Sequence, residues 1–86
     1  MHTVYILLLS NKQLYTGSTS NLKRRIEEHK AGKSQFTKNR LPVKLIFYEV
    51  FNNKEDANKR ERYFKTSKGK YSLKAMLRKT LIITNK

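Results

Sequence analysis

The chain contains no cysteine, which excludes disulfide bonds and zinc sites built on thiolates. Its longest apolar run, residues 4–9, is far shorter than the roughly 20 residues that a helix needs to span a bilayer. Residues 1–3 carry no basic cluster of the kind that opens a secretory signal. A chain without cysteine is compatible with a reducing compartment, so we expect an intracellular, cytoplasmic protein.

Acidic residues are also scarce, with six Asp and Glu against 20 Lys and Arg and a formal net charge of +14. A surface this positive attracts polyanions, of which nucleic acid is the first candidate and an anionic membrane face the second. The third interpretation of this charge is a solvated basic surface that has no specific partner. Because apolar periodic segments separate the charges along the whole chain, we expect a folded domain rather than a disordered basic tail.

The N-terminal half carries clear secondary-structure signals. Residues 3–10 are rich in Val, Ile, Tyr and Leu, which predicts a strand, and a polar turn leads to a short second strand at 14–16. These strands would form an antiparallel hairpin. A helix is predicted at 20–31, with Ser20 as its N-cap and Gly32 just past its end.

The second half begins with another apolar segment. Residues 43–51 have apolar side chains at odd and even positions, which predicts a strand buried on both faces and therefore central in the sheet. A helix is predicted to begin after Asn52 or Asn53 and to continue to about Thr66. Residues 67–70 form a glycine-containing basic break.

The last predicted helix covers residues 71–79, and 81–86 would form a short strand or a frayed tail. The apolar side of that helix would consist of Leu73, Met76 and Leu77. The order β-β-α-β-α-α, with a three-stranded, mainly antiparallel sheet flanked by helices, predicts an α/β architecture of the α+β sandwich type. The length of 86 residues fits one domain, which we expect at 1–80 with a tail at 81–86.

Glu61 stands out in the helix that follows residue 53. It lies on one helical stripe with Ala57 and Phe64, at i, i+4 and i+7, and so points where a core residue is expected. An ionised carboxylate in that position is costly unless a base pairs with it or it binds a metal ion. Both readings remain open on the pattern alone. Six acids scattered among 20 bases do exclude the carboxylate cluster of an ordinary two-metal nuclease.

Arg25 and His29 lie one turn apart on the flank of an apolar stripe in the first helix. A histidine late in a helix is most often a capping or surface residue, and the helix C-terminus favours its cationic form. Tyr5 and Tyr15 lie on adjacent hairpin strands. They either fill the core or place their hydroxyls at its rim, and the sequence does not fix the register that decides which face each uses.

Taken together, these residues resemble a known family. The segment "VYI" at 4–6 and the segment "YTG" at 15–17 resemble the two half-motifs of the GIY-YIG nuclease superfamily. Arg25 and His29 match the family's arginine and a histidine found in many members. "KRERYFK" at 59–65 matches the helix that carries the metal-binding glutamate. The pieces occur in the family's order over nearly the whole chain, and they are most similar to the small single-domain bacterial type, akin to the nuclease domains of excision-repair and homing endonucleases.

The resemblance implies a hydrolase that cleaves DNA with the help of a divalent metal, in DNA repair or recombination, and that associates with the nucleoid. Glu61 would hold a single Mg²⁺ or Mn²⁺, with water in the remaining positions. Arg25 would clamp a phosphate oxygen, and Tyr15, helped by Tyr5 or His29, would position or deprotonate the attacking water. Gly17 and Ser18 would give the phosphate access to the backbone. Ser18 stands where some repair relatives have a lysine.

Basic side chains would bind the DNA backbone without reading its sequence. The residues expected to do so are Lys23, Arg24, Lys33, Lys38, Arg40, Lys65, Lys68 and Lys70. RNA stays open as a substrate. Two alternatives also stay open: a basic nucleic-acid-binding module with the same fold and little or no turnover, and a subunit that acts only with a repair or recombination partner protein.

Overall fold

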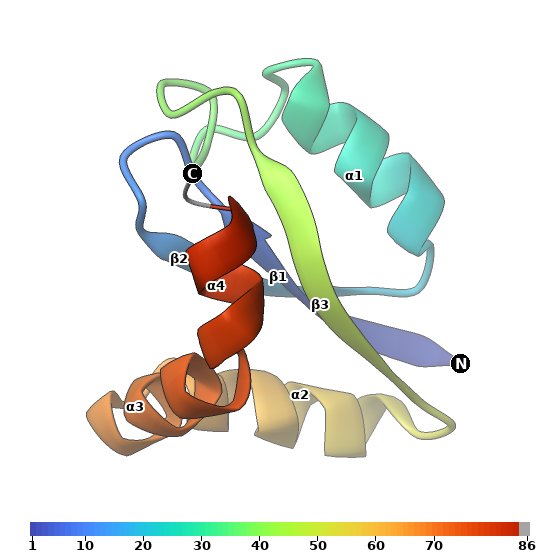
Figure 1. Cartoon of the computed structure of the whole chain (residues 1–86). Coiled ribbons are helices and arrows are strands. Elements are labelled where there is room, and N and C mark those ends of the chain that lie inside the picture. Colours follow the sequence, from blue (N-terminus) through green and yellow to red (C-terminus); the bar gives the residue numbers. More distant parts are fainter. Residues whose placement is uncertain (85–86) are drawn as a thin grey trace.

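A three-stranded antiparallel sheet lies between helices in the computed structural model, which describes residues 1–84 (Figure 1). The helix α1 covers one face of the sheet, and α2, α3 and α4 lie against the other face. The elements are β1 (His2–Leu8), β2 (Leu14–Thr19), α1 (Leu22–Lys30), β3 (Lys44–Phe51), α2 (Lys54–Phe64), α3 (Ser67–Met76) and α4 (Arg78–Thr84). The predicted α+β sandwich is confirmed, with one more helix than expected.

The strand β1 is central, and its alternating side chains supply both halves of the core. Val4 and Ile6 pack against the α2–α3 side, whereas Tyr5, Leu7 and Leu9 pack against the α1 side. All five are buried. Successive side chains of a strand point to opposite faces, so a central strand covered on both sides must be apolar at every position. The run at residues 4–9 has this composition.

The prediction that residues 43–51 form the central strand is wrong. The sheet order is β2-β1-β3, so β3 lies at an edge. Tyr48 and Val50 are 54% and 51% exposed, which shows that part of one face of β3 remains open to solvent. Apolar residues at both odd and even positions therefore do not identify a central strand. An edge strand that exposes some aromatic and aliphatic side chains has the same pattern.

The ends of α1 are set by Asn21 and Gly32. Asn21, rather than the predicted Ser20, is the N-cap, because its side-chain oxygen accepts a hydrogen bond from the Arg24 N–H. Gly32 was predicted correctly and has a φ of +77°, a left-handed conformation that favours glycine. Its N–H donates to the His29 carbonyl, and the Lys33 N–H donates to the Glu28 carbonyl, which completes a Schellman cap.

The predicted break at residues 67–70 is instead the first turn of α3. The Thr66 hydroxyl oxygen accepts a hydrogen bond from the Gly69 N–H at 3.0 Å and caps that helix. Gly69 is buried, and a Cβ there would overlap the backbone carbonyl of Tyr63. The glycine therefore allows α2 and α3 to approach closely; it does not interrupt a helix. Asn53, one of the two predicted caps, does cap α2.

The C-terminal segment differs from both predicted alternatives. Residues 78–84 form α4, not a strand or a frayed end, whereas residues 85–86 of the predicted tail lie outside the described residues. Leu73 and Leu77 are buried as predicted, but Met76 is 50% exposed and is therefore not part of the core. Within residues 1–84, no helix has both the length and the apolar character required to cross a bilayer.

Candidate active site

The hairpin register places Tyr5 and Tyr15 on the same face of the sheet. Tyr5 pairs with Gly17 and Leu7 pairs with Tyr15 across the two strands. Residues directly opposite each other in an antiparallel pair project to one face, and both tyrosines pack in the cluster under α1. Their ring centroids are 6.4 Å apart. The register, which the sequence left open, thus brings two phenols together.

Gly17 lies directly beside the Tyr5 ring. A Cβ at Gly17 would overlap the hydroxyl and the adjacent ring carbon of Tyr5. The phenol of Tyr5 is 1% exposed, so it has no free space into which to move. The glycine of "YTG" is therefore required for the close packing of Tyr5 against β2, independently of any contact between its backbone and a ligand.

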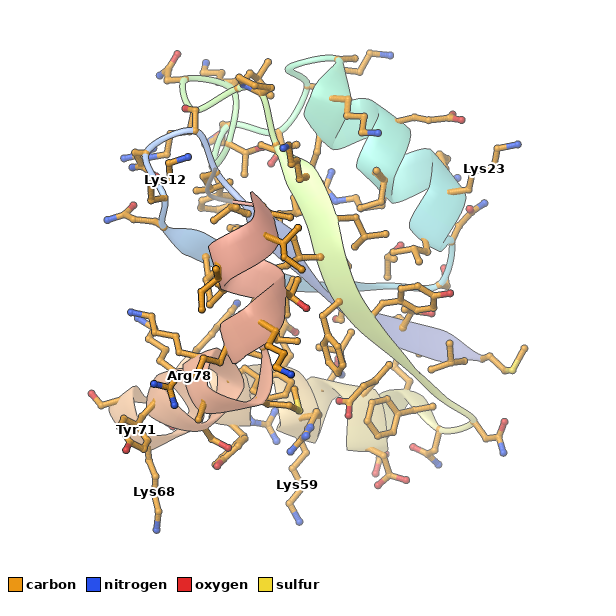
Figure 2. All side chains as sticks on the ribbon, in the orientation of Figure 1. Lys12, Lys23, Lys59, Lys68, Tyr71 and Arg78 are labelled. Carbon is orange, nitrogen blue, oxygen red and sulfur yellow. The ribbon has the colours of Figure 1, made fainter. Side chains whose placement is uncertain are left out.

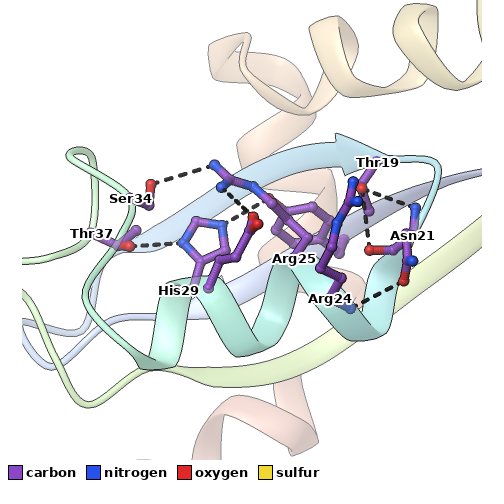
Figure 3. Close-up of polar contacts among 9 residues, drawn as sticks. Thr19, Asn21, Arg24, Arg25, His29, Ser34 and Thr37 are labelled. Atoms are coloured by element: carbon purple, nitrogen blue, oxygen red, sulfur yellow. Dashed lines mark hydrogen bonds and ion pairs between the residues drawn. The ribbon is translucent and has the colours of Figure 1, made fainter.

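His29 joins the hairpin to the loop that follows α1. It is fully buried, its Nε2 lies 2.9 Å from the Tyr5 hydroxyl, and its Nδ1 lies 2.8 Å from the Thr37 hydroxyl (Figure 3). Thr37 is also fully buried. The Tyr5–His29–Thr37 chain thereby fixes the imidazole between two hydroxyl groups, and His29 is a core residue rather than a surface or capping one.

The charge state of His29 is opposite to the one that its position near the helix C-terminus suggests. Burial lowers the pKa of His29, and the nearby Arg25 guanidinium lowers it further, while Glu28 acts in the opposite direction. The neutral imidazole has one N–H and one lone pair, which suits a ring held between two hydroxyl groups. The expectation of a favoured cation is therefore corrected by burial.

This neutral histidine makes stability depend on pH. Because the pKa of His29 is lower in the folded chain than the ordinary value of about 6.5, the unfolded chain binds more protons as the pH falls below 7. We expect the free energy of unfolding to decrease from about pH 7 to about pH 5.5, with a slope of up to about 1.4 kcal/mol per pH unit. Urea unfolding at several pH values measures this slope.

The chain contains two histidines, and substituting each of them in turn gives a matched pair of variants for this measurement. His29→Gln should flatten the slope over that pH range, and His2→Gln, which removes the histidine outside the site, should leave it in place. A slope that survives in His29→Gln would show that another group causes it.

Tyr5 keeps its phenolic proton in this setting. Burial raises its pKa to about 12; Arg25 opposes that rise, and the charges of Tyr15 and Glu61 add to it. Tyr15, by contrast, is only half-buried, with its ring 5.3 Å from the His29 ring centroid. Of the two phenols, Tyr15 is the one that keeps part of its surface open to solvent.

Arg25 lies at the rim of this cluster. It is half-buried, pairs with Glu28 at 3.2 Å and donates a long hydrogen bond of 3.5 Å to the Ser34 hydroxyl (Figure 3). Although burial acts to lower it, contacts with Tyr5 and Glu28 raise the pKa of Arg25 above its ordinary value. The guanidinium is a permanent cation next to the phenols, with part of its surface open to an incoming anion.

Glu61 reaches the same strand from the other side of the sheet. Its side chain is 21% exposed, and its Oε1 accepts a hydrogen bond from the Ser18 hydroxyl at 3.1 Å. Its Oε2 pairs with Lys65 at 3.1 Å. Ser18 thus holds the carboxylate at the edge strand β2, and the charge of Glu61 acts to raise the pKa of the Tyr5 phenol.

The donor atoms around Glu61 suit a hard divalent cation. Magnesium is commonly held by one or two carboxylates, with water and substrate phosphate in the remaining positions. The Glu61 carboxylate and the Ser18 hydroxyl supply such oxygen atoms within 3.1 Å of each other. No group of three or more His, Asp or Glu residues able to hold a metal occurs in residues 1–84. Lys65, which pairs with the carboxylate, is 56% exposed, so a cation at Glu61 would compete with an ion pair that is open to solvent.

The predicted phosphate-binding residues are exposed but divide into two groups. The first group, on α1 and the loop after it, comprises Lys23, Arg24, Lys33, Lys38 and Arg40. The second, at the end of α2 and on α3, comprises Lys65, Lys68 and Lys70. Figure 2 shows Lys23 and Lys68 projecting from opposite sides of the sheet. The two groups are thus carried by elements that pack on opposite faces of the sheet.

Sequence reasoning missed several residues that shape this region. Ser34 and Thr37 are buried hydroxyl groups in a basic loop, and no local signal shows that they contact Arg25 and His29. Lys12 and Lys74 were also missed. With Lys70 they line a cavity of about 390 Å³ between the hairpin turn and α3. The positive φ of Lys12 sets that turn, which sequence periodicity does not reveal.

The fold and this arrangement of side chains define a small nuclease-type domain. Residues 1–74 match the family model described as the GIY-YIG catalytic domain, and the chain belongs to the GIY-YIG family.

Proteins similar to this chain occur in bacteria. It is 48% identical over 66 residues to the UPF0213 protein SpyM50708 of Streptococcus pyogenes serotype M5, which covers 76% of this chain and 72% of the relative. The UPF0213 protein M28_Spy1146 of Streptococcus pyogenes serotype M28 shows the same identity and coverage. The solution NMR structure of the UPF0213 protein BH0048 from Bacillus halodurans matches with a TM-score of 0.57 and 35% identity, over 87% of this chain and 83% of that chain.

Proposed function

We propose that this chain is a divalent-metal-dependent DNA endonuclease that hydrolyses phosphodiester bonds. The observation that carries the proposal is the hydrogen bond from Ser18 to Glu61. It holds the carboxylate of α2 against the strand that also carries Tyr15 and Gly17. The charges of both Glu61 and Arg25 act on the Tyr5 phenol, which supports one site shared by the carboxylate, the phenols and the guanidinium. Phosphate hydrolysis needs a metal ligand, a group to orient water and a cation for the developing charge.

Each residue has a distinct role in this proposal. Glu61 would hold a single Mg²⁺ or Mn²⁺, which supplies Lewis-acid stabilisation of the phosphate when bound. Arg25 binds a non-bridging phosphate oxygen through its planar fork and stabilises charge that builds there. The Tyr15 hydroxyl orients the attacking water. Tyr5 stays protonated, and the buried His29 positions it through the 2.9 Å contact to its hydroxyl.

The net charge of +14 supports DNA as the substrate, because exposed basic side chains on both faces of the sheet can neutralise backbone phosphates. Contacts with the phosphate backbone do not depend on the base sequence, so we propose that the chain has only a weak preference for particular DNA sequences. A role in bacterial DNA repair or recombination, with a partner protein that directs the chain to its site, is part of the same proposal.

A binding module without turnover is the second candidate, and the Glu61–Lys65 ion pair favours it, because Lys65 neutralises the carboxylate that a metal would need. Supercoiled plasmid separates the two candidates when it is incubated with the protein in Mg²⁺, in Mn²⁺ or in chelator. We expect nicked circles with either metal, none with chelator, and DNA retardation on gels in all three. Retardation without metal-dependent nicking would assign the chain to the binding class.

A further inference from the structure

Phe36 is an exposed aromatic residue at the mouth of the proposed site. Its ring is stacked on Tyr15, with centroids 6.3 Å apart and an interplanar angle of 27°. The residue is nevertheless 66% exposed, so most of its surface, including much of the face away from Tyr15, is open to solvent. Tyr15 in turn lies against His29. Phe36 thus extends the aromatic cluster of the site outward.

Two buried hydroxyl groups of the loop hold Phe36 in this position. Ser34, two residues before Phe36, and Thr37, directly after it, are 4% and 0% exposed and bind Arg25 and His29 respectively. A turn closes between them, with the Thr37 N–H donating to the Ser34 carbonyl at 3.2 Å. The polar anchors thus bind both sides of the turn to α1 and leave the phenylalanine at its tip. The fold therefore holds an aromatic ring in solvent next to Tyr15, in a fixed position from which it can stack on a planar group of a ligand.

The charges around Phe36 identify the chemistry of that partner. Lys33, Lys38 and Arg40 lie in the same loop and are exposed. A flat apolar ring among cations, beside a guanidinium that faces the site, is poorly suited to an apolar protein surface, which would desolvate the charges. It does suit single-stranded nucleic acid, in which bases stack on aromatic side chains and cations follow the backbone.

We propose that Phe36 stacks on an unpaired nucleobase next to the scissile phosphate, and that DNA with unpaired nucleotides is therefore the preferred substrate class. The inference rests on the proposed function, since it places the phosphate of that nucleotide between Arg25 and Tyr15. In a duplex both faces of each base are covered by neighbouring bases, so a ring at this position gains contact only with a base that has left the stack.

A tryptophan reporter tests the contact directly. The chain contains no tryptophan, so Phe36→Trp introduces a single fluorophore at the tip of the loop. In chelator, which prevents cutting, we expect a single-stranded oligonucleotide to quench this fluorescence. The same oligonucleotide annealed to its complement should have little effect, and so should one in which abasic nucleotides keep every phosphate and remove the bases. Equal quenching by all three would overturn the stacking contact.

Affinity measurements provide the second readout. We expect Phe36→Leu to weaken binding of single-stranded DNA by about 5- to 100-fold and binding of duplex by less than about twofold. The matched control is Tyr71→Leu, which removes another exposed ring, on α3, at 78% exposure (Figure 2). It should change neither affinity by more than about twofold. If Phe36→Leu weakens both DNA forms equally or not at all, this inference fails while the endonuclease proposal stands. If the wild-type chain binds no DNA, both fail.

Discussion

Replacement of Glu61 by glutamine is expected to slow plasmid nicking by about 10³-fold or more, with little change in stability. Glutamine keeps the side-chain oxygen that accepts the Ser18 hydroxyl, so the local geometry is retained. It loses the negative charge, and with it the ability to hold a divalent cation where only one carboxylate is present. Removing metal stabilisation of a phosphate transition state costs several kcal/mol, which corresponds to a rate loss of about this size.

The loss in free energy of unfolding should be small, because the substitution removes only the Glu61–Lys65 ion pair, in which the lysine is exposed to solvent. Lys65 is 56% exposed, and such pairs contribute roughly 0.2–1 kcal/mol. Thermal unfolding of the variant and titration with Mn²⁺ complete the measurement: we expect a Tm within a few degrees of the wild type and weaker Mn²⁺ binding.

Glu55 provides the matched control for this substitution. It lies in the first turn of the same helix and is exposed, so Glu55→Gln removes the same charge far from Ser18. We expect nicking within about twofold of the wild type, with at most the small stability loss of about 0.3–1 kcal/mol that follows from an acid at a helix N-terminus. Nicking by Glu61→Gln at more than a tenth of the wild-type rate would contradict the assigned role of Glu61.

The sequence predicted those parts of the fold that local patterns specify. The hairpin, α1 and α2 follow from strand composition, the 3.6-residue period and cap residues such as Asn53 and Gly32. The order of strands in the sheet was not predictable in the same way. β1 and β3 are both apolar at successive positions, and only the packing of helices on both faces of β1 distinguishes the central strand from the edge strand.

The candidate site shows the same division. Tyr5, Tyr15, Arg25 and His29 are separated along the chain by spacings that the family motif makes recognisable, and the structure brings them together. The partners that hold them in place are not visible in any local window, since Thr37 reaches His29 only after the loop folds back on α1. Whether a tyrosine faces α1 depends on hairpin register, which one residue of slip would reverse.

A second large effect, on the free energy of unfolding, is expected when Gly69 is replaced by alanine. Helix propensity and steric overlap predict changes of opposite sign at this position. On helix propensity alone, Gly69→Ala should stabilise α3 by about 1 kcal/mol. The added Cβ, however, would overlap the Tyr63 carbonyl oxygen and press on the Cα of Phe64. That carbonyl cannot turn away cheaply, because it accepts hydrogen bonds from both the N–H and the hydroxyl of Thr66. The junction of α2 and α3 would have to open.

We therefore expect Gly69→Ala to lower the free energy of unfolding by about 3 kcal/mol, because the overlap with backbone outweighs the gain in propensity. Denaturant unfolding measures this loss, which is a large fraction of the total for a small domain. Ser72→Ala, at an exposed position of the same helix, is the control and should stay within about 0.5 kcal/mol of the wild type. A variant Gly69→Ala as stable as the wild type would show that α3 can shift away from α2 at no cost. Lys65 is the C-cap of α2 and forms an ion pair with Glu61. A shift at the junction of α2 and α3 would therefore also move the ion-pair partner of the Glu61 carboxylate.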